Sequence, residues 1–235
     1  MSATDDPLFP PRPLPLVPVR DSSRGFPIHR IFCVGRNYAA HAAEMGATAV
    51  KEDPFYFTKS PFSYVASGAT IPYPPGTADC HHEMELVAAI GAAGFRLPLE
   101  KALDLVFGYA CGLDLTRRDL QGEAKDKRRP WDLGKDFENA AVLSEIVPAA
   151  AIGHPTAGRI ELSVNGETRQ SGDLAEMINS VAETIVHLSR FYHLAPGDLV
   201  YTGTPSGVGP VVPGDRLEGR IDGVGEITLT IGEPE

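Results

Sequence analysis

The sequence predicts an α+β domain in which short strands build most of the core and helices are few. Three observations support this class. Residues 199–231 are rich in glycine and have the pattern of several short strands, and Asn165-Gly166 is a strong signal for a hairpin turn. Helical spacing of apolar residues is clearest in one long segment, 177–191. At 235 residues, the chain is long enough for one domain with a substantial core.

The N-terminal segment, residues 1–27, is predicted to be an arm rather than part of the domain. Its first 20 residues contain six prolines, which fix φ and remove backbone donors. This segment is therefore expected to be extended, and the domain itself is placed at 28–235.

The elements of the domain follow in chain order. The run 28–35 predicts a strand ending at Gly35, and residues 36–46 predict a helix capped by Asn37 and closed by Gly46. The later predictions are strand and loop over 54–65, a strand over 83–90, a short helix over 99–105, a buried strand over 106–116 leading into a helix, the hairpin at Asn165-Gly166, a helix within 177–191, and short strands from 199 onward.

Charge and cysteine content exclude several classes of protein. The formal net charge is -10, which argues against binding the phosphates of nucleic acid, and the short basic run 125–129 is typical of a solvated surface. Three cysteines are too few and uneven for a disulfide framework. No apolar stretch approaches the roughly 18 residues of a membrane span, and the N-terminus lacks the layout of a signal peptide. We therefore expect a cytoplasmic protein with neither a nucleic acid nor a membrane as partner.

The segment CHHEMEL, residues 80–86, is the first candidate for metal chemistry. On a strand, Glu83 and Glu85 point to the same face, where two like charges repel each other unless a cation lies between them. Paired carboxylates suit a hard cation such as Mg²⁺ or Mn²⁺, and a solvent-facing acidic pair is the alternative. A zinc site using Cys80 and the two histidines is disfavoured, because neighbouring strand residues point to opposite faces.

Asp114 is the second candidate, because it lies within the otherwise apolar segment 106–116. A buried aspartate needs a partner, and a cation shared with Glu83 and Glu85 is one. A helix cap or an ion pair with an arginine are the alternatives. The charged residues that follow Asp114 lie at a predicted helix start, where anionic groups bind well.

Three further patterns have both a chemical and an ordinary interpretation. Lys135 lies between two apolar residues and either polarises a bound carbonyl group or is a surface lysine with a buried stem. The glycine-rich loop over 201–210, with the hydroxyl of Thr204, either approaches a ligand or is only a turn. His41 and Glu44 are either a base with its orienting carboxylate or a surface pair.

Seven motifs together resemble those of the fumarylacetoacetate hydrolase superfamily, in the same order. They are GRNYAAHAAEMG, FTKSP, HHEMELVAAIG, GYACGLDLTRRDLQ, RPWDLGKDFE, VNGETRQSGD and GDLVYTGTPSGVGPV. The resemblance runs from about residue 28 to the C-terminus and is to the small, single-domain branch of acylpyruvases and bacterial fumarylpyruvate hydrolases.

This resemblance implies a mixed β-sandwich roll, usually a homodimer, that hydrolyses a carbon–carbon bond in a 2,4-diketo acid. The implied substrate is fumarylpyruvate, from gentisate-type catabolism of aromatic compounds. Hydrolysis of other acylpyruvates and decarboxylation of oxaloacetate are the alternatives within the superfamily. The implied cofactor is Mg²⁺ or Mn²⁺, with Ca²⁺ as a substitute in crystals.

The resemblance also implies roles for individual residues. The implied metal ligands are Glu83, Glu85 and Asp114. The implied catalytic residues are His41 and Glu44, which would activate water, and Lys135. The implied contacts to substrate are Arg36, Lys59, Arg118, Gln121 and Thr204, with one arginine among Arg36, Arg117 and Arg118 holding a remote carboxylate.

Overall fold

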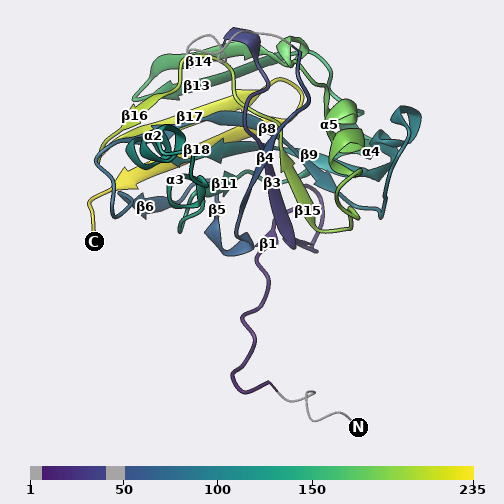
Figure 1. Cartoon of the computed structure of the whole chain (residues 1–235), viewed down its shortest axis with the longest axis horizontal. Helices are drawn as coiled ribbons and strands as arrows, with labels where there is room; N and C mark the ends of the chain where they lie inside the picture. Colours follow the sequence, from purple (N-terminus) through teal and green to yellow (C-terminus); the bar gives the residue numbers. More distant parts are fainter. Residues whose placement is uncertain (1–6, 41–50) are drawn as a thin grey trace.

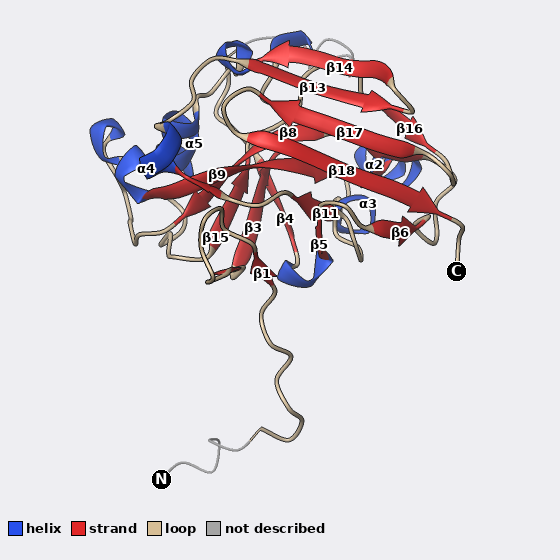
Figure 2. Cartoon of the chain, turned by 180° about the vertical axis from the view of Figure 1, so that it is seen from behind, coloured by secondary structure: helices blue, strands red, loops and turns tan. Residues whose placement is uncertain are grey.

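Two large β-sheets pack against each other in the structure, a computed structural model that describes residues 7–40 and 51–235 (Figures 1 and 2). The larger sheet has the order β4 (Tyr56–Lys59), β3 (Arg30–Val34), β15 (Asp198–Tyr201), β8 (Met84–Ile90), β9 (Val106–Asp114), β11 (Ala141–Leu143) and β5 (Tyr64–Ala66), with β12 (Val147–Pro148) also paired to β9. The second sheet has the order β14 (Glu167–Asp173), β13 (Arg159–Val164), β17 (Arg216–Ile221), β18 (Gly225–Gly232) and β6 (Thr70–Pro72). The α+β class with a curled mixed sheet is confirmed.

Smaller elements close the fold around these sheets. A three-stranded sheet is formed by β10 (Thr116–Arg117), β7 (Cys80–His82) and β16 (Gly209–Val211), and a short ribbon by β1 (Leu16–Val17) and β2 (Phe26–Pro27). The helices are α2 (Arg118–Asp126), α3 (Asp132–Lys135), α4 (Ala149–Ile152) and α5 (Val181–Leu188), with 3₁₀ turns at Pro61–Ser63, Leu99–Lys101, Leu103–Leu105 and Leu174–Glu176. No helix in the described ranges has the length and apolar character needed to cross a membrane.

The central strand β8 is buried on both faces, which explains its nearly continuous run of apolar residues. Leu86 and Ala88 pack into the core between the two large sheets. Val87 and Ala89 point the other way, into a second core with residues of β3, β15 and β11. Because strand residues alternate, Glu85, two positions before Val87, must face the same side as this second core.

Most predicted strands are confirmed, and the helix predictions show two differences. The hairpin turn is confirmed, with φ of 54° at Asn165 and 80° at Gly166. The helix predicted over 99–105 is wrong, because this short segment between Pro98 and β9 forms two 3₁₀ turns, too little chain for a stable α-helix. The helix predicted within 177–191 is shorter, because Met177 pairs in an extended bridge and Ser180 caps the helix.

The described part of the predicted N-terminal arm behaves in two ways. Residues 7–15 are extended and lead away from the body in Figure 1, with Leu8 89% and Phe9 76% exposed. Further along, Val17 and Phe26 are buried in the second core, where β1 pairs with β2. Segment 16–27 therefore packs against the domain. The helix predicted over 36–46 lies largely outside the described residues.

Candidate metal and substrate site

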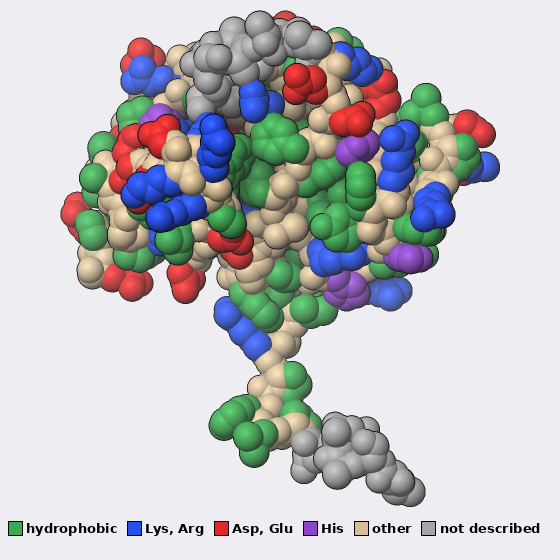
Figure 3. All heavy atoms as spheres, viewed as in Figure 1, with side chains coloured by type: hydrophobic (Ala, Val, Ile, Leu, Met, Phe, Trp, Pro, Cys, Tyr) green, Lys and Arg blue, Asp and Glu red, His purple; other side chains and the backbone are tan. Residues whose placement is uncertain are grey.

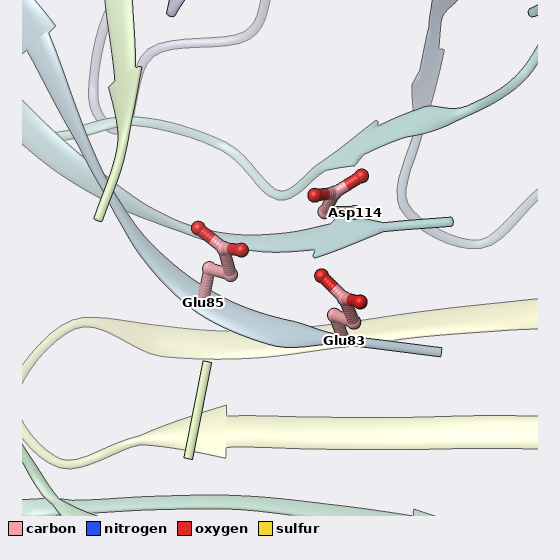
Figure 4. A group of neighbouring side chains, drawn as sticks. All are labelled: Glu83, Glu85 and Asp114. Atoms are coloured by element: carbon pink, nitrogen blue, oxygen red, sulfur yellow. The ribbon is translucent and has the colours of Figure 1, made fainter. Parts of the chain in front are cut away.

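Strand register brings three carboxylates to one place at the end of β8 and β9. Glu85 is paired with Gly112, and the amide of Asp114 donates to the carbonyl of Glu83 at 2.9 Å. Alternation then puts Glu83, Glu85 and Asp114 on the same face of the sheet. The three side chains face one another in Figure 4, and one oxygen of each lies within 4.8 Å of the others. The side-by-side arrangement expected from Glu-x-Glu is therefore present.

These carboxylates are almost completely removed from water. Glu83 is 5% exposed, Glu85 1% and Asp114 0%. Burial raises the pKa of Glu85 well above its usual range, and the charges of Asp114 and Glu83 raise it further. Three carboxylates in a dry site repel one another strongly, so the fold must supply positive charge or leave room for a cation.

Two buried lysines supply part of that charge. Lys135 Nζ donates to Glu83 Oε2 at 2.8 Å, Asp114 Oδ2 at 2.7 Å and Thr116 Oγ1 at 2.7 Å. These bonds use all three hydrogens of an ammonium group. Burial lowers the pKa of Lys135, but the charges of Asp114 and Glu83 outweigh burial, so the pKa is raised and the lysine stays charged.

Lys59 approaches Asp114 from another side. Its Nζ lies 2.8 Å from Asp114 Oδ1 and donates to the carbonyl oxygens of Leu115 and Lys135. The side chain has no exposed surface, and these three partners all belong to the protein. The expectation that Lys59 touches substrate therefore stays a prediction, and its observed contacts instead hold Asp114 and the end of α3 together.

The three carboxylates suit a hard divalent cation. Within the described residues, Asp114 Oδ1 is buried without a hydrogen-bond donor, despite its proximity to Lys59. Glu85 accepts a bond of 2.7 Å from the Gly203 amide, and no lysine or arginine of the described chain forms an ion pair with it. A set of three convergent carboxylates matches the preference of Mg²⁺ and Mn²⁺ for oxygen ligands. Among the described residues this is the only such cluster, so the zinc alternative at Cys80 has no geometric support.

Gly203 has a specific reason to be glycine. Its φ is +95°, and a Cβ at this position would lie 2.7 Å from the Cβ of Asn37. This backbone conformation aims the amide at Glu85. Asn37 is itself buried and bonds to the backbone of Asn179 and Thr202, which fixes the loop after β15 against the segment that precedes residue 41.

Arg118 joins the carboxylate cluster to helix α2. Its Nη2 lies 2.5 Å from Glu83 Oε1, its Nη1 donates to Gln121 Oε1 at 2.6 Å, and its Nε donates to His81 Nδ1 at 3.4 Å. His81 Nε2 lies 2.9 Å from Asp79. Burial, and next the charge of Arg118, lower the pKa of His81, which agrees with a neutral ring that accepts at Nδ1. The guanidinium is thus held in one orientation beside Glu83.

A cavity of about 120 Å³ opens beside Glu83. Helices α2 and α3 form one wall. They can approach closely because residue 134 is a glycine: a Cβ at this position would lie only 2.9 Å from the backbone nitrogen of Gln121. The lining is mostly cationic or polar and consists of Gly35, Arg36, Glu83, Arg118, Gln121, Lys125, Trp131 and Lys135.

Thr204 is held by a glutamine that sequence reasoning missed. Gln170 is fully buried, and its Nε2 donates to Thr204 Oγ1 at 2.7 Å and to the carbonyl of Pro205 at 2.9 Å. Its Oε1 accepts from the amide of Met84 and lies 3.0 Å from His82 Nδ1. Gln170 thus ties the glycine-rich loop to the start of β8. Its only sequence signal is its place in the VNGETRQSGD motif.

The structure gathers most of the predicted site residues around one cavity. Glu83 of the carboxylate triad lines it, together with Arg36, Arg118, Gln121 and Lys135. Thr204 and Lys59 are buried nearby with protein partners. His41 and Glu44 lie outside the described residues, so their role as a water-activating pair stays a prediction.

Comparison with known proteins agrees with this architecture. The family model described as fumarylacetoacetate (FAA) hydrolase C-terminal matches residues 30–232. A fumarylpyruvate hydrolase of a Ralstonia species is 56% identical over 184 residues, which is 78% of this chain and 95% of the relative. A mitochondrial oxaloacetate tautomerase of Mus musculus is 42% identical, covering 87% of this chain and 92% of the relative.

A solved structure is also very similar. The crystal structure of fumarylpyruvate hydrolase from Pseudomonas aeruginosa in complex with Mn²⁺ and pyruvate is 48% identical and superposes with a TM-score of 0.94. The match covers 97% of this chain and all of that one. With a family model spanning most of the chain and a buried carboxylate triad, this protein belongs to the fumarylacetoacetate hydrolase family.

Proposed function

We propose that this protein is a metal-dependent hydrolase that cleaves fumarylpyruvate to fumarate and pyruvate. The observation that carries the proposal is the convergence of Glu83, Glu85 and Asp114 beside a small cavity with a cationic lining. A diketo acid with a carboxylate at each end matches both features. The relatives that act on fumarylpyruvate, one of them crystallised with Mn²⁺ and pyruvate, support the same choice.

Glu83, Glu85 and Asp114 would hold the metal. When bound, a divalent cation supplies Lewis-acid charge to the 2-oxo-carboxylate end of the substrate and favours the enolate that forms there. Lys135 contributes a fixed positive charge at the same side of the cavity, because its raised pKa keeps it protonated. Its three hydrogens already bind protein groups, so its contribution is electrostatic and also positions Glu83 and Asp114.

The hydrolytic step needs a base and a water molecule. We assign the base to His41, oriented by Glu44. It would take a proton from a water molecule as the water oxygen attacks the carbonyl carbon of the fumaryl group. The carbon–carbon bond to the methylene group then breaks, and its electron pair remains as the enolate of pyruvate. Protonation of that carbon gives pyruvate, and the attacked carbonyl leaves as the carboxylate of fumarate.

A second candidate is favoured by the oxaloacetate tautomerase relative. Enolisation and decarboxylation of oxaloacetate use the same 2-oxo-carboxylate end and the same enolate, but need no attacking water. The need for an attacking water therefore distinguishes hydrolysis from the oxaloacetate reactions. His41→Ala would abolish hydrolysis while leaving metal binding intact.

The test is turnover of three substrates by purified protein with Mg²⁺ or Mn²⁺. Fumarylpyruvate, acetylpyruvate and oxaloacetate are compared by kcat/KM, with a chelator as the control. The proposal expects fumarylpyruvate to be preferred and activity to be lost on chelation. Preference for oxaloacetate, or turnover that survives chelation, would overturn it.

We also propose a homodimer that acts in the cytoplasm, in catabolism of aromatic compounds. Large apolar side chains remain exposed on the single chain, among them Leu133 at 72% and Phe191 at 66%, which a partner copy would cover. The three free cysteines are all buried, in keeping with a reducing compartment. Light scattering of the purified protein tests the dimer, and a monomeric mass would contradict it.

A further inference from the structure

Helix α2 directs three side chains toward the cavity. Arg118, Gln121 and Lys125 are separated by three and four residues, so they lie on one face of the helix, and all three line the cavity. The sequence had suggested a solvated surface for the run that begins at Lys125. In the structure its ammonium lies 5.2 Å from the centre of the Trp131 ring, another residue of the cavity wall.

The cations of the cavity differ in whether they have a carboxylate partner. Arg118 is paired with Glu83, and Lys135 is paired with Glu83 and Asp114. Within the described ranges, neither Lys125 nor Arg36 forms an ion pair, and Arg36 instead lies over the ring of Phe55. Figure 3 shows Lys and Arg side chains gathered over α2. Among the residues that the structure describes, the cavity lining therefore has two positive charges, Lys125 and Arg36, without an ion-pair partner.

This excess charge is unfavourable until an anion enters. Burial lowers the pKa of Lys125, and the nearby charges of Arg118 and Arg36 lower it further. An anionic group between Lys125 and Arg36 would replace mutual repulsion by attraction. Lys125 and Arg36 are both exposed at the edge of the cavity, so such a group can reach them, and the Trp131 ring lies against the Lys125 ammonium.

We infer that Lys125, with Arg36 beside it, binds the carboxylate at the end of the substrate remote from the metal triad. Lys125 thereby selects 2,4-diketo acids with two carboxylates over those with one. This inference rests on the proposed function, since it assigns the far end of the same substrate. It differs from the expectation that an arginine alone serves this end, because Arg118 is already bound to Glu83 and Gln121.

The test compares Lys125→Met with wild type and with Lys125→Arg. Methionine keeps an apolar stem against Trp131 but removes the charge, and arginine restores the charge. We expect the ratio of kcat/KM for fumarylpyruvate to that for acetylpyruvate to fall by about tenfold to a hundredfold in Lys125→Met, mainly through KM. Lys125→Arg should recover most of the ratio, which a purely structural role would not predict.

The matched control is Lys127→Met, two residues away at the end of α2, where the lysine is exposed and pairs with Glu123. This control should leave the ratio unchanged. An equal loss for both substrates in Lys125→Met, or no loss, would overturn the inference.

A binding measurement separates this inference from the proposed hydrolysis. Calorimetric titration with fumarate needs no turnover, so it remains informative even if the wild-type protein cleaves neither diketo acid. Weaker fumarate binding by Lys125→Met than by wild type supports the inference. Equal binding by the two proteins, or no binding by either, overturns it.

Discussion

Replacing Lys135 by methionine tests how the carboxylate cluster is kept stable. The ammonium is buried and makes three hydrogen bonds, to Glu83, Asp114 and Thr116. Methionine has a similar length and no charge, so the substitution leaves two buried carboxylates with less compensation. It creates little empty space, which limits the effect of packing.

Removing one partner of a buried ion pair costs about 3–5 kcal/mol, because the remaining charge stays buried. For a chain of this size each kcal/mol lowers Tm by about 2–4 °C, so the expected fall in the metal-free protein is roughly 6–20 °C. Mn²⁺ should then restore more stability to Lys135→Met than to wild type, since it meets two less compensated carboxylates and one competing ammonium fewer.

Thermal unfolding in a chelator and in excess Mn²⁺ measures both effects. The scans are run at about pH 8, where the carboxylates of Lys135→Met gain little relief by taking up protons. Lys127→Met is the control, because this lysine is half exposed and forms only a surface pair with Glu123. A metal-free Tm for Lys135→Met equal to that of wild type, or a smaller gain with Mn²⁺, would refute the reasoning.

Three further predictions concern the same region. Gly203→Ala would force an L side chain into a positive φ and against Asn37, misplacing the amide that binds Glu85, so Tm and Mn²⁺ affinity should both fall. Gln170→Leu would leave the buried amide of Met84 without its acceptor, and chemical denaturation should report a loss of about 1–3 kcal/mol. The gain in Tm from Mn²⁺ should be larger at about pH 8 than at about pH 6. The raised pKa of Glu85 means that the folded metal-free protein holds a proton, so its stability rises as pH falls, and the metal must displace that proton.

Each of these has a clear contrary outcome. Unchanged Mn²⁺ affinity in Gly203→Ala would mean that the backbone amide of Gly203 does not contribute to metal binding. The control is Gly76→Ala, at another positive φ where the added Cβ meets nothing within 4 Å. Full stability of Gln170→Leu would mean that Met84 finds another acceptor. A Mn²⁺ gain that is independent of pH would show that Glu85 binds no proton in the metal-free protein.

The alternation of side chains along strands was enough to predict that Glu83 and Glu85 lie together and that Asp114 needs a partner. Two glutamates separated by one residue in an extended segment must share a face, and an aspartate within an apolar strand must find a partner. The sequence motifs then linked Asp114 to the pair, and the register of β8 against β9 explains why these residues meet.

The partners of the triad could not be predicted from local pattern. Lys59 and Lys135 come from an edge strand and a short helix, and both meet Asp114 only because the sheet curls and α3 closes against α2. The alternation of side chains along a strand predicts the face on which a residue lies, but not which distant segment of the chain covers that face. Gln170 and Lys125 were missed for the same reason, since each looks like an ordinary polar residue until its neighbours in space are known.

The most direct test of the central claim is calorimetric titration of the metal-free protein with Mn²⁺. Wild type should bind a single Mn²⁺ per chain. Glu85→Gln and Asp114→Asn keep the side-chain shape but remove a charged oxygen ligand. They should weaken Mn²⁺ binding by more than about a hundredfold, which exceeds the loss expected when a residue that only contacts a metal ligand is changed. The Glu123→Gln variant, changed at an exposed residue of α2, should bind Mn²⁺ as wild type does. Equal Mn²⁺ affinity in all four proteins would contradict the assignment of the triad as the metal site.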